Sequence, residues 1–161
     1  MTARKKGIRE ELKQTKPFQN VAEEAFLSIA RTADVISQRY EQFLKGWDIS
    51  GTQYNVLRIL RGAGAEGLRC GEIGARMVTH DPDITRLLDR MEKAGWIERA
   101  RDTKDRRVVL TRISSDGLQL LKQIDKPIEE LNGQIAKPLS DKKMLRLIDA
   151  LDELRSVLAK D

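Results

Sequence analysis

The chain has 161 residues, of which 34% are charged and only 4% are aromatic, and its formal net charge is +5 at pH 7. This length is typical of one domain, and an apolar content drawn mostly from Ala, Leu, Ile and Val favours packed helices over a β-sandwich or barrel. The charged N-terminus lacks the apolar segment of a secretory signal, and no apolar run is long enough to cross a membrane. We therefore expect a mainly α-helical protein in the cytoplasm, without a membrane partner.

The scarcity of metal ligands and nucleophiles argues against catalysis. One cysteine and one histidine are too few for an internal disulfide framework or a structural zinc site. The sequence also lacks a nucleophile paired with a base, carboxylates paired in a pocket-forming context, and a phosphate-binding glycine loop. We expect no enzyme, no catalytic residues, no metal and no cofactor.

Two segments hold most of the positive charge. Residues 1–16 carry six basic and two acidic side chains, and residues 99–112 also carry six basic and two acidic ones. The rest of the chain has a small excess of acid. Positive charge gathered at separate places indicates a polyanionic partner that is contacted at those places.

The N-terminal part of the chain predicts a tail and two helices. Residues 1–16 have no sustained apolar period, so we expect a flexible basic tail. From residue 18 to residue 46, apolar side chains recur every three or four positions, which predicts one long amphipathic helix. Ser50 and Gln53 have the spacing of a capping box, so a second helix is expected from there to Gly62.

The following segment predicts a helix, a turn and a second short helix. The first helix covers about residues 72–77, and the turn covers residues 79–81. Asp81 and Pro82 then predict a helix start, because aspartate accepts hydrogen bonds from free amides and proline has no amide hydrogen to leave unpaired. This second helix is expected to end near Lys93.

A β-hairpin is predicted directly after that helix. Gly95 fits the left-handed position just beyond a helix end. Residues 96–100 and 107–113 are rich in β-branched and aromatic residues, and the residues between them are charged, which predicts two strands joined by a basic tip.

Two long helices are predicted at the C-terminal end, over about residues 114–160. Ser114 and Ser140 are the expected N-caps, and a kink is expected at Pro127. Their leucine and isoleucine stripes expose more apolar surface than one small domain can cover, so a subunit interface is favoured over an internal core.

The short helix after Pro82 has one buried and one polar face. Its apolar positions follow the spacing i, i+3, i+4 and i+7: Ile84, Leu87, Leu88 and Met91. The opposite face carries Thr85, Arg86, Asp89, Arg90 and Lys93. Alone, such a face is equally well explained as an ordinary solvated surface. As the second helix of a helix-turn-helix followed by a basic hairpin, it fits the major groove of DNA, where arginine pairs with guanine edges.

Residues 85–114, TRLLDRMEKAGWIERARDTKDRRVVLTRIS, resemble the winged helix of the multiple-antibiotic-resistance regulator (MarR) family. Residues 49–60, ISGTQYNVLRIL, and the long flanking helices resemble it more weakly. The resemblance implies a single domain over residues 17–161, a winged helix-turn-helix over about 50–113, and dimerisation helices over about 18–46 and 114–160. It also implies an obligate homodimer.

The resemblance also implies roles for individual residues. Thr85, Arg86 and Arg90 correspond to positions that face base edges and phosphates. Arg107 corresponds to the wing arginine that enters the minor groove, and Asp105 to the aspartate that holds the wing's shape through a salt bridge. The full DNA-binding set that we predict is Thr85, Arg86, Arg90, Lys93, Arg99, Asp105, Arg106 and Arg107, with phosphate contacts expected for Arg99 and Arg106.

The segment before the recognition helix departs from the family pattern. Residues 79–83, THDPD, are more acidic than the serine-rich stretch usual there, and carboxylates near a phosphate repel it. Capping is the expected purpose of Asp81, whereas Asp83 has no assigned role. For His80, a phosphate contact or an exposed position is favoured over catalysis or proton sensing.

Three other side chains have two interpretations each. Cys70 is either a small buried apolar residue, which we favour, or an oxidant sensor. Tyr40 and Trp47 either line a pocket for a small aromatic effector, as the resemblance implies, or simply pack between helices.

Together these features predict a ligand-responsive transcriptional regulator, most simply a repressor. It would bind a pseudo-palindromic operator in double-stranded DNA as a homodimer and leave it when a small molecule changes the spacing of the two recognition helices. The alternative is a protein-interaction module that has kept the winged-helix fold. In that case the basic wing would be dispensable.

Overall fold

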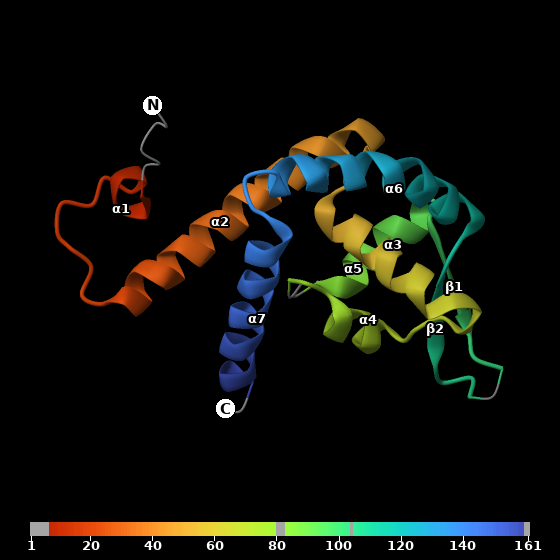
Figure 1. Ribbon diagram of the computed structural model, residues 1–161. Helices are drawn as coiled ribbons and strands as arrows, with labels where there is room; N and C mark the ends of the chain where they lie inside the picture. The colour runs from red at the N-terminus through yellow and green to blue at the C-terminus, as the bar shows by residue number, and fades with distance from the viewer. Residues whose placement is uncertain (1–6, 80–82, 104, 160–161) are drawn as a thin grey trace.

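The computed structural model describes residues 7–79, 83–103 and 105–159. Figure 1 shows a mainly helical protein with one antiparallel hairpin, as the sequence predicts. The elements are α1 (Ile8–Glu11), α2 (Val21–Leu44), α3 (Gly51–Ala63), α4 (Cys70–Arg76), α5 (Ile84–Lys93), β1 (Ile97–Arg101), β2 (Val109–Ile113), α6 (Ser115–Ala136) and α7 (Asp141–Leu158), with short 3-10 turns at Lys45–Trp47 and Gly64–Glu66. None of the described helices has the length and apolar content needed to cross a membrane.

The hydrophobic core lies where α3, α4, α5 and the hairpin meet the C-terminal end of α2 and the first half of α6. Its fully buried members include Leu44, Leu57, Ile73, Met91 and Leu121. The N-terminal half of α2 and the whole of α7 extend away from this core (Figure 1). Leu44 is the one buried residue of α2, and α7 has none. The compact part is therefore the winged helix with α6 packed on it, and the N-terminal half of α2 and the whole of α7 project from it.

Serine side chains cap two of the helices as the sequence predicts. The Ser50 hydroxyl accepts a hydrogen bond from Gln53 N at 3.2 Å, and Ser50 N donates to Gln53 Oε1 at 2.9 Å, which completes the capping box of α3. The Ser114 hydroxyl accepts from Gly117 N at 3.1 Å at the start of α6. Ser140 stands at the N-cap of α7, but its side chain makes no capping hydrogen bond, so that part of the prediction is wrong.

The boundaries differ from the sequence prediction at three places. The basic N-terminal segment contains α1, which was not predicted, and Glu11 of α1 forms an ion pair with Arg31 of α2 at 3.7 Å. Helix α4 begins at Cys70, before the predicted start. Helix α5 begins at Ile84, and the predicted start at Asp81 and Pro82 lies outside the described residues. The division into a tail over residues 1–16 and a domain over residues 17–161 stays a prediction.

The hairpin is fixed to the rest of the winged helix by backbone hydrogen bonds. Strands β1 and β2 pair from Ile97 with Ile113 to Arg101 with Val109. Leu68 adds a short third partner, because its N donates to Thr111 O at 3.0 Å and its O accepts from Thr111 N at 2.8 Å. Gly67 has φ +73°, and a Cβ there would lie 2.7 Å from Thr111 O. A glycine is thus required for the segment before α4 to approach the wing.

Candidate nucleic-acid interface

Helix α5 has the two faces that its sequence predicts. Leu87, Leu88 and Met91 are at most 2% exposed, and Ile84 packs partly buried against the same core. The burial of this stripe turns the other face outward, and its cationic and hydroxyl side chains are exposed: Thr85, Arg86, Arg90 and Lys93. Arg86, Arg90 and Lys93 line a shallow hollow of about 420 Å³ together with Asp83 and Asp89. The outer face of α5 is therefore a cationic surface with carboxylates interleaved.

Asp83 has a specific partner, which the sequence did not reveal. Its Oδ2 lies 3.2 Å from Nε of Arg86, one turn further along α5. Asp83 occupies the N-cap position, but its side chain makes no capping hydrogen bond. Arg86 is 83% exposed at its side chain, so the pair lies on the open surface. Asp83, one of the acidic residues that depart from the family pattern, thus forms an ion pair with an arginine that is expected to contact DNA.

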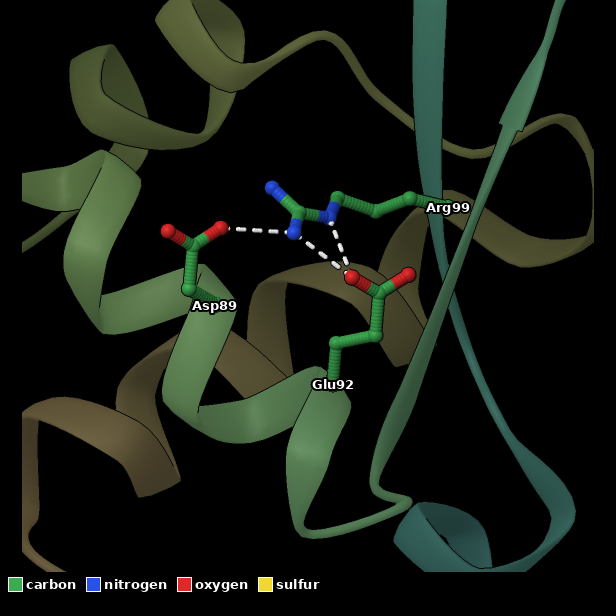
Figure 2. A network of polar contacts seen from close by, with 3 residues as sticks. All are labelled: Asp89, Glu92 and Arg99. Atoms are coloured by element: carbon green, nitrogen blue, oxygen red, sulfur yellow. Dashed lines mark hydrogen bonds and ion pairs between the residues drawn. The ribbon is translucent and has the colours of Figure 1, made fainter.

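Arg99 of β1 connects the wing to α5 (Figure 2). Its Nη2 donates to Asp89 Oδ1 and to Glu92 Oε2, both at 2.6 Å, and its Nε donates to the same Glu92 oxygen at 2.9 Å. The Arg99 side chain is 25% exposed. Hydrogen bonding to Arg99 lowers the pKa of Glu92, and the bond to Glu92 raises the pKa of Arg99. The Glu92 carboxylate and the Arg99 guanidinium therefore remain charged at neutral pH.

This arrangement bears on the expected role of Arg99. Two carboxylates already bind its guanidinium, which leaves little net positive charge to attract a phosphate. Asp89 also lines the hollow on α5, so the ion pairs place the base of the wing beside the recognition face. The geometry favours a positioning role for Arg99 over the phosphate contact that we predicted.

The tip of the wing is shaped by Asp105. Its Oδ1 accepts a hydrogen bond from the backbone N of Arg107 at 3.0 Å, and its backbone O accepts from Val108 N at 2.9 Å. We expected a salt bridge here. Among the described residues the structure shows a backbone hydrogen bond in its place, because an aspartate readily bonds the amide two residues on in a turn. Arg106 and Arg107 are exposed, and Lys104 lies outside the described residues.

A hydrogen bond supports the segment that leads into α5. The backbone N of Val78 donates to Oδ1 of Asn55 on α3 at 3.0 Å. Sequence analysis missed Asn55, because nothing in the local pattern of α3 indicates a partner 23 residues away.

Sequence analysis also missed the role of Glu92, although its spacing of three from Asp89 places both carboxylates on one side of a helix. His80 lies outside the described residues.

A second cavity, of about 530 Å³, lies between α2, α3 and the segment before α5. Tyr40 is among its lining residues, and its hydroxyl is hydrogen-bonded to Asn132 of α6. Burial raises the pKa of Tyr40 above its ordinary value of 10.0. Trp47 does not line the cavity; it packs against Phe43 with ring centroids 5.1 Å apart. Tyr40, but not Trp47, therefore lines this cavity.

Cys70 is the first residue of α4 and is partly buried against the hydrophobic core. This position agrees with the packing role that we favour for its thiol.

Comparison with known proteins bears on this site. A family model described as the MarR family matches residues 49–109. The regulator FarR of Neisseria gonorrhoeae, an HTH-type transcriptional regulator, is 26% identical over 131 residues, which cover 81% of this chain and 88% of FarR. The crystal structure of a MarR transcription factor from Planctomyces limnophilus is 32% identical, with a TM-score of 0.64, and the match covers 84% of this chain and 98% of that one. The chain belongs to the MarR family.

A protein crystallised with a small molecule is also similar. NadR in complex with 4-hydroxyphenylacetate is 25% identical, with a TM-score of 0.68, and the match covers 86% of this chain and 97% of NadR. The segment matched by the MarR family model contains α3, α4, α5 and β1. The outer face of α5, the Arg99 network and most of the wing therefore lie in this matched segment.

Proposed function

We propose that this protein is a transcriptional regulator that binds a pseudo-palindromic operator in double-stranded DNA as a homodimer. A small ligand in the cavity beside Tyr40 lowers its affinity for the operator. Repression is the simplest mode of action, because a protein released from DNA by a ligand restores access to the site that it covered.

One observation carries the DNA-binding part of this proposal. A buried apolar stripe on α5 turns Thr85, Arg86, Arg90 and Lys93 outward, and the ion pairs of Arg99 hold the wing beside that face. A short helix with outward arginines suits the major groove, and exposed Arg106 and Arg107 at the wing tip suit the neighbouring minor groove or its phosphates.

The apolar surface of the projecting helices supports the homodimer. On α7, large apolar side chains are between 38% and 74% exposed: Leu145, Leu147, Ile148, Leu154, Val157 and Leu158. On α2, Val21, Phe26, Ile29 and Val35 are also exposed. Exposed apolar stripes on helices near both ends of one chain are typical of an interface between copies, and a two-fold pair presents two α5 helices to one duplex.

The position of the cavity supports ligand control. Its lining includes Tyr40 on α2 and Tyr54 on α3, and also Val78 and Thr79, which directly precede the segment that leads into α5. If this segment has two conformations, a ligand that binds one of them more tightly shifts the equilibrium towards that conformation. The shift in free energy is no larger than the difference between the ligand's binding free energies for the two conformations. The size of the cavity is typical of small-molecule sites.

A footprint on the DNA upstream of the protein's own gene tests the proposal. We expect protection of two half-sites whose centres are about 10 base pairs apart, at low salt. R86A and R107A should each weaken protection at least about tenfold and reduce its dependence on salt, because each removes a cation that contacts DNA. K122A on α6 is the matched control, since it removes one exposed cation away from α5 and should bind like the parent protein. Absence of any protected region at low salt would contradict the proposal.

A further inference from the structure

Glu41 is the charged residue that lines the cavity beside Tyr40. The remaining lining residues are neutral: Ile36, Ser37, Tyr40, Leu44, Gly51, Thr52, Tyr54, Asn55, Val78 and Thr79. Among the residues that the structure describes, the wall of the cavity therefore contains one carboxylate and no lysine or arginine.

The Glu41 carboxylate occupies the place where an anionic ligand would gain most. Its Oε1 accepts a hydrogen bond from Gly51 N at 2.7 Å, at the first residue of α3. A helix N-terminus favours anions because its first amides are unpaired and its dipole is positive there. A Cβ at position 51 would lie 2.5 Å from that same oxygen, so glycine leaves room for the carboxylate. The protein's own glutamate thus takes the anion-binding position.

Arg58 approaches the wall of the cavity but does not line it. Its Nη1 donates to the Tyr54 hydroxyl at 3.0 Å, and its guanidinium lies 5.8 Å from the centre of the Tyr54 ring. The ring of Tyr54 is therefore already in contact with a cation, whereas Tyr40 lines the cavity and packs partly buried against the core. A ring in the cavity wall attracts an ammonium group placed over its face.

From these contacts we propose that the cavity binds an aromatic cation, with the ligand's ammonium group beside Glu41 and its ring among the apolar lining residues. This inference rests on the proposed function, because it names the class of ligand for the cavity that regulates DNA binding. It differs from the anionic 4-hydroxyphenylacetate that is bound in NadR. An aromatic carboxylate in this cavity would approach the Glu41 carboxylate and be repelled by it.

Three probes of nearly equal size separate charge from shape. 4-Hydroxyphenylacetate is an anion, 4-hydroxyphenylacetamide is neutral, and 4-(2-aminoethyl)phenol is a cation at neutral pH. Calorimetric titration of the full-length protein should give the tightest binding for the amine and the weakest for the acid. We expect the amine to bind at least about fivefold more tightly than the acid, which corresponds to about 1 kcal/mol.

Glu41→Gln is the decisive variant. Glutamine keeps an oxygen that can accept the bond from Gly51, so the capping contact and the fold are retained while the charge is lost. In E41Q the ratio of amine to acid affinity should fall below about twofold. Glu24→Gln removes the same charge from the same helix away from the cavity, and it should keep the ratio of the parent protein.

The inference is overturned if the acid binds as tightly as the amine, if the preference survives in E41Q, or if none of the three probes binds. The footprint on operator DNA, measured on the same preparations without ligand, keeps the two proposals distinct. An intact footprint with a cavity that prefers the acid contradicts only the class of ligand, whereas loss of the footprint contradicts the proposed function.

Discussion

The carboxylate of Asp83 lies 3.2 Å from Nε of Arg86 across the first turn of α5. In the absence of DNA this pair partly neutralises an arginine that we expect to contact the duplex. When Arg86 turns to a base edge or a phosphate, the pair must break, and the Asp83 carboxylate remains close to the phosphates. Both effects reduce the affinity of the protein for DNA.

Asp83→Asn should therefore tighten operator binding. Asparagine is as good an N-cap residue as aspartate, so α5 is expected to begin at the same place. Exposed ion pairs contribute little, so the gain should be about two- to fivefold in Kd. Fluorescence anisotropy with a labelled operator duplex at two salt concentrations measures it. D141N, which removes one carboxylate at the start of α7, controls for net charge, and an equal gain in both variants would contradict a local role for Asp83.

Arg99→Lys separates positioning from phosphate contact. Lysine keeps the charge, but it cannot bond Asp89 and Glu92 with the fork of donors that arginine offers. If Arg99 positions the wing against α5, R99K should lower the melting temperature by a few degrees and weaken operator binding about fivefold. If Arg99 contacts a phosphate instead, R99K should melt and bind like the parent protein.

The R99K result is checked by a second substitution. In a protein that already carries E92Q, the effect of R99K should be smaller than in the parent protein, because E92Q has already weakened the bond between residues 92 and 99. R101K, at the outer end of β1, is the matched control because Arg101 is exposed and shares no ion pair of this network.

The Glu92 carboxylate should make stability depend on pH. Its folded pKa is lowered below the ordinary value of 4.5 by hydrogen bonding to Arg99. The stabilisation is therefore fully present above pH 4.5 and is lost as the pH falls through the lower folded pKa. Thermal melts from neutral pH to about pH 3 should show the parent protein more stable than E92Q at neutral pH, with the difference shrinking as Glu92 becomes protonated. A difference that stays constant at all pH values would contradict this.

The apolar face of α7 provides a test of the homodimer. Ile148→Lys places a charge in the middle of the stripe that a second copy is expected to cover. We expect it to shift the protein from dimer to monomer in sedimentation experiments and to weaken operator binding at least about tenfold, since the two recognition helices would no longer be linked. D149K puts the same lysine at the next position, about 100° around the helix, and should remain dimeric. A monomeric parent protein would contradict the homodimer directly.

Local patterns in the sequence were enough to predict most of the fold. The capping box of Ser50 and Gln53, the left-handed Gly95 and the apolar stripe on α5 all depend on residues within seven positions of one another. The two long C-terminal helices were also recognisable from their apolar periods. The period of α6 continues through Pro127.

The contacts that connect distant parts of the chain were not predictable in the same way. A phosphate contact was predicted for Arg99 because it matches a position that is commonly basic in the family, and its partners on α5 become apparent only when β1 lies beside that helix. Two other contacts also depend on how the helices pack. One is the hydrogen bond between Asn55 and Val78, and the other places the carboxylate of Glu41, a residue of α2, at the first residue of α3. For Trp47 the sequence left both interpretations open, and the structure places it against Phe43 in the 3-10 turn after α2, where it does not line the cavity.

Asn55 gives a last test, on the connection between the cavity and α5. It lines the cavity and accepts the hydrogen bond of Val78 N, so it holds the start of the segment that leads into the recognition helix. Asn55→Ala should speed hydrogen exchange of the Val78 amide at least about fivefold and weaken operator binding about threefold, because the amide loses its partner and the segment gains freedom. Asn55→Asp keeps an accepting oxygen of the same reach and should restore the slow exchange. If exchange at Val78 is equally slow in N55A, the hydrogen bond does not fix this segment, and a ligand in the cavity must reach α5 by another contact.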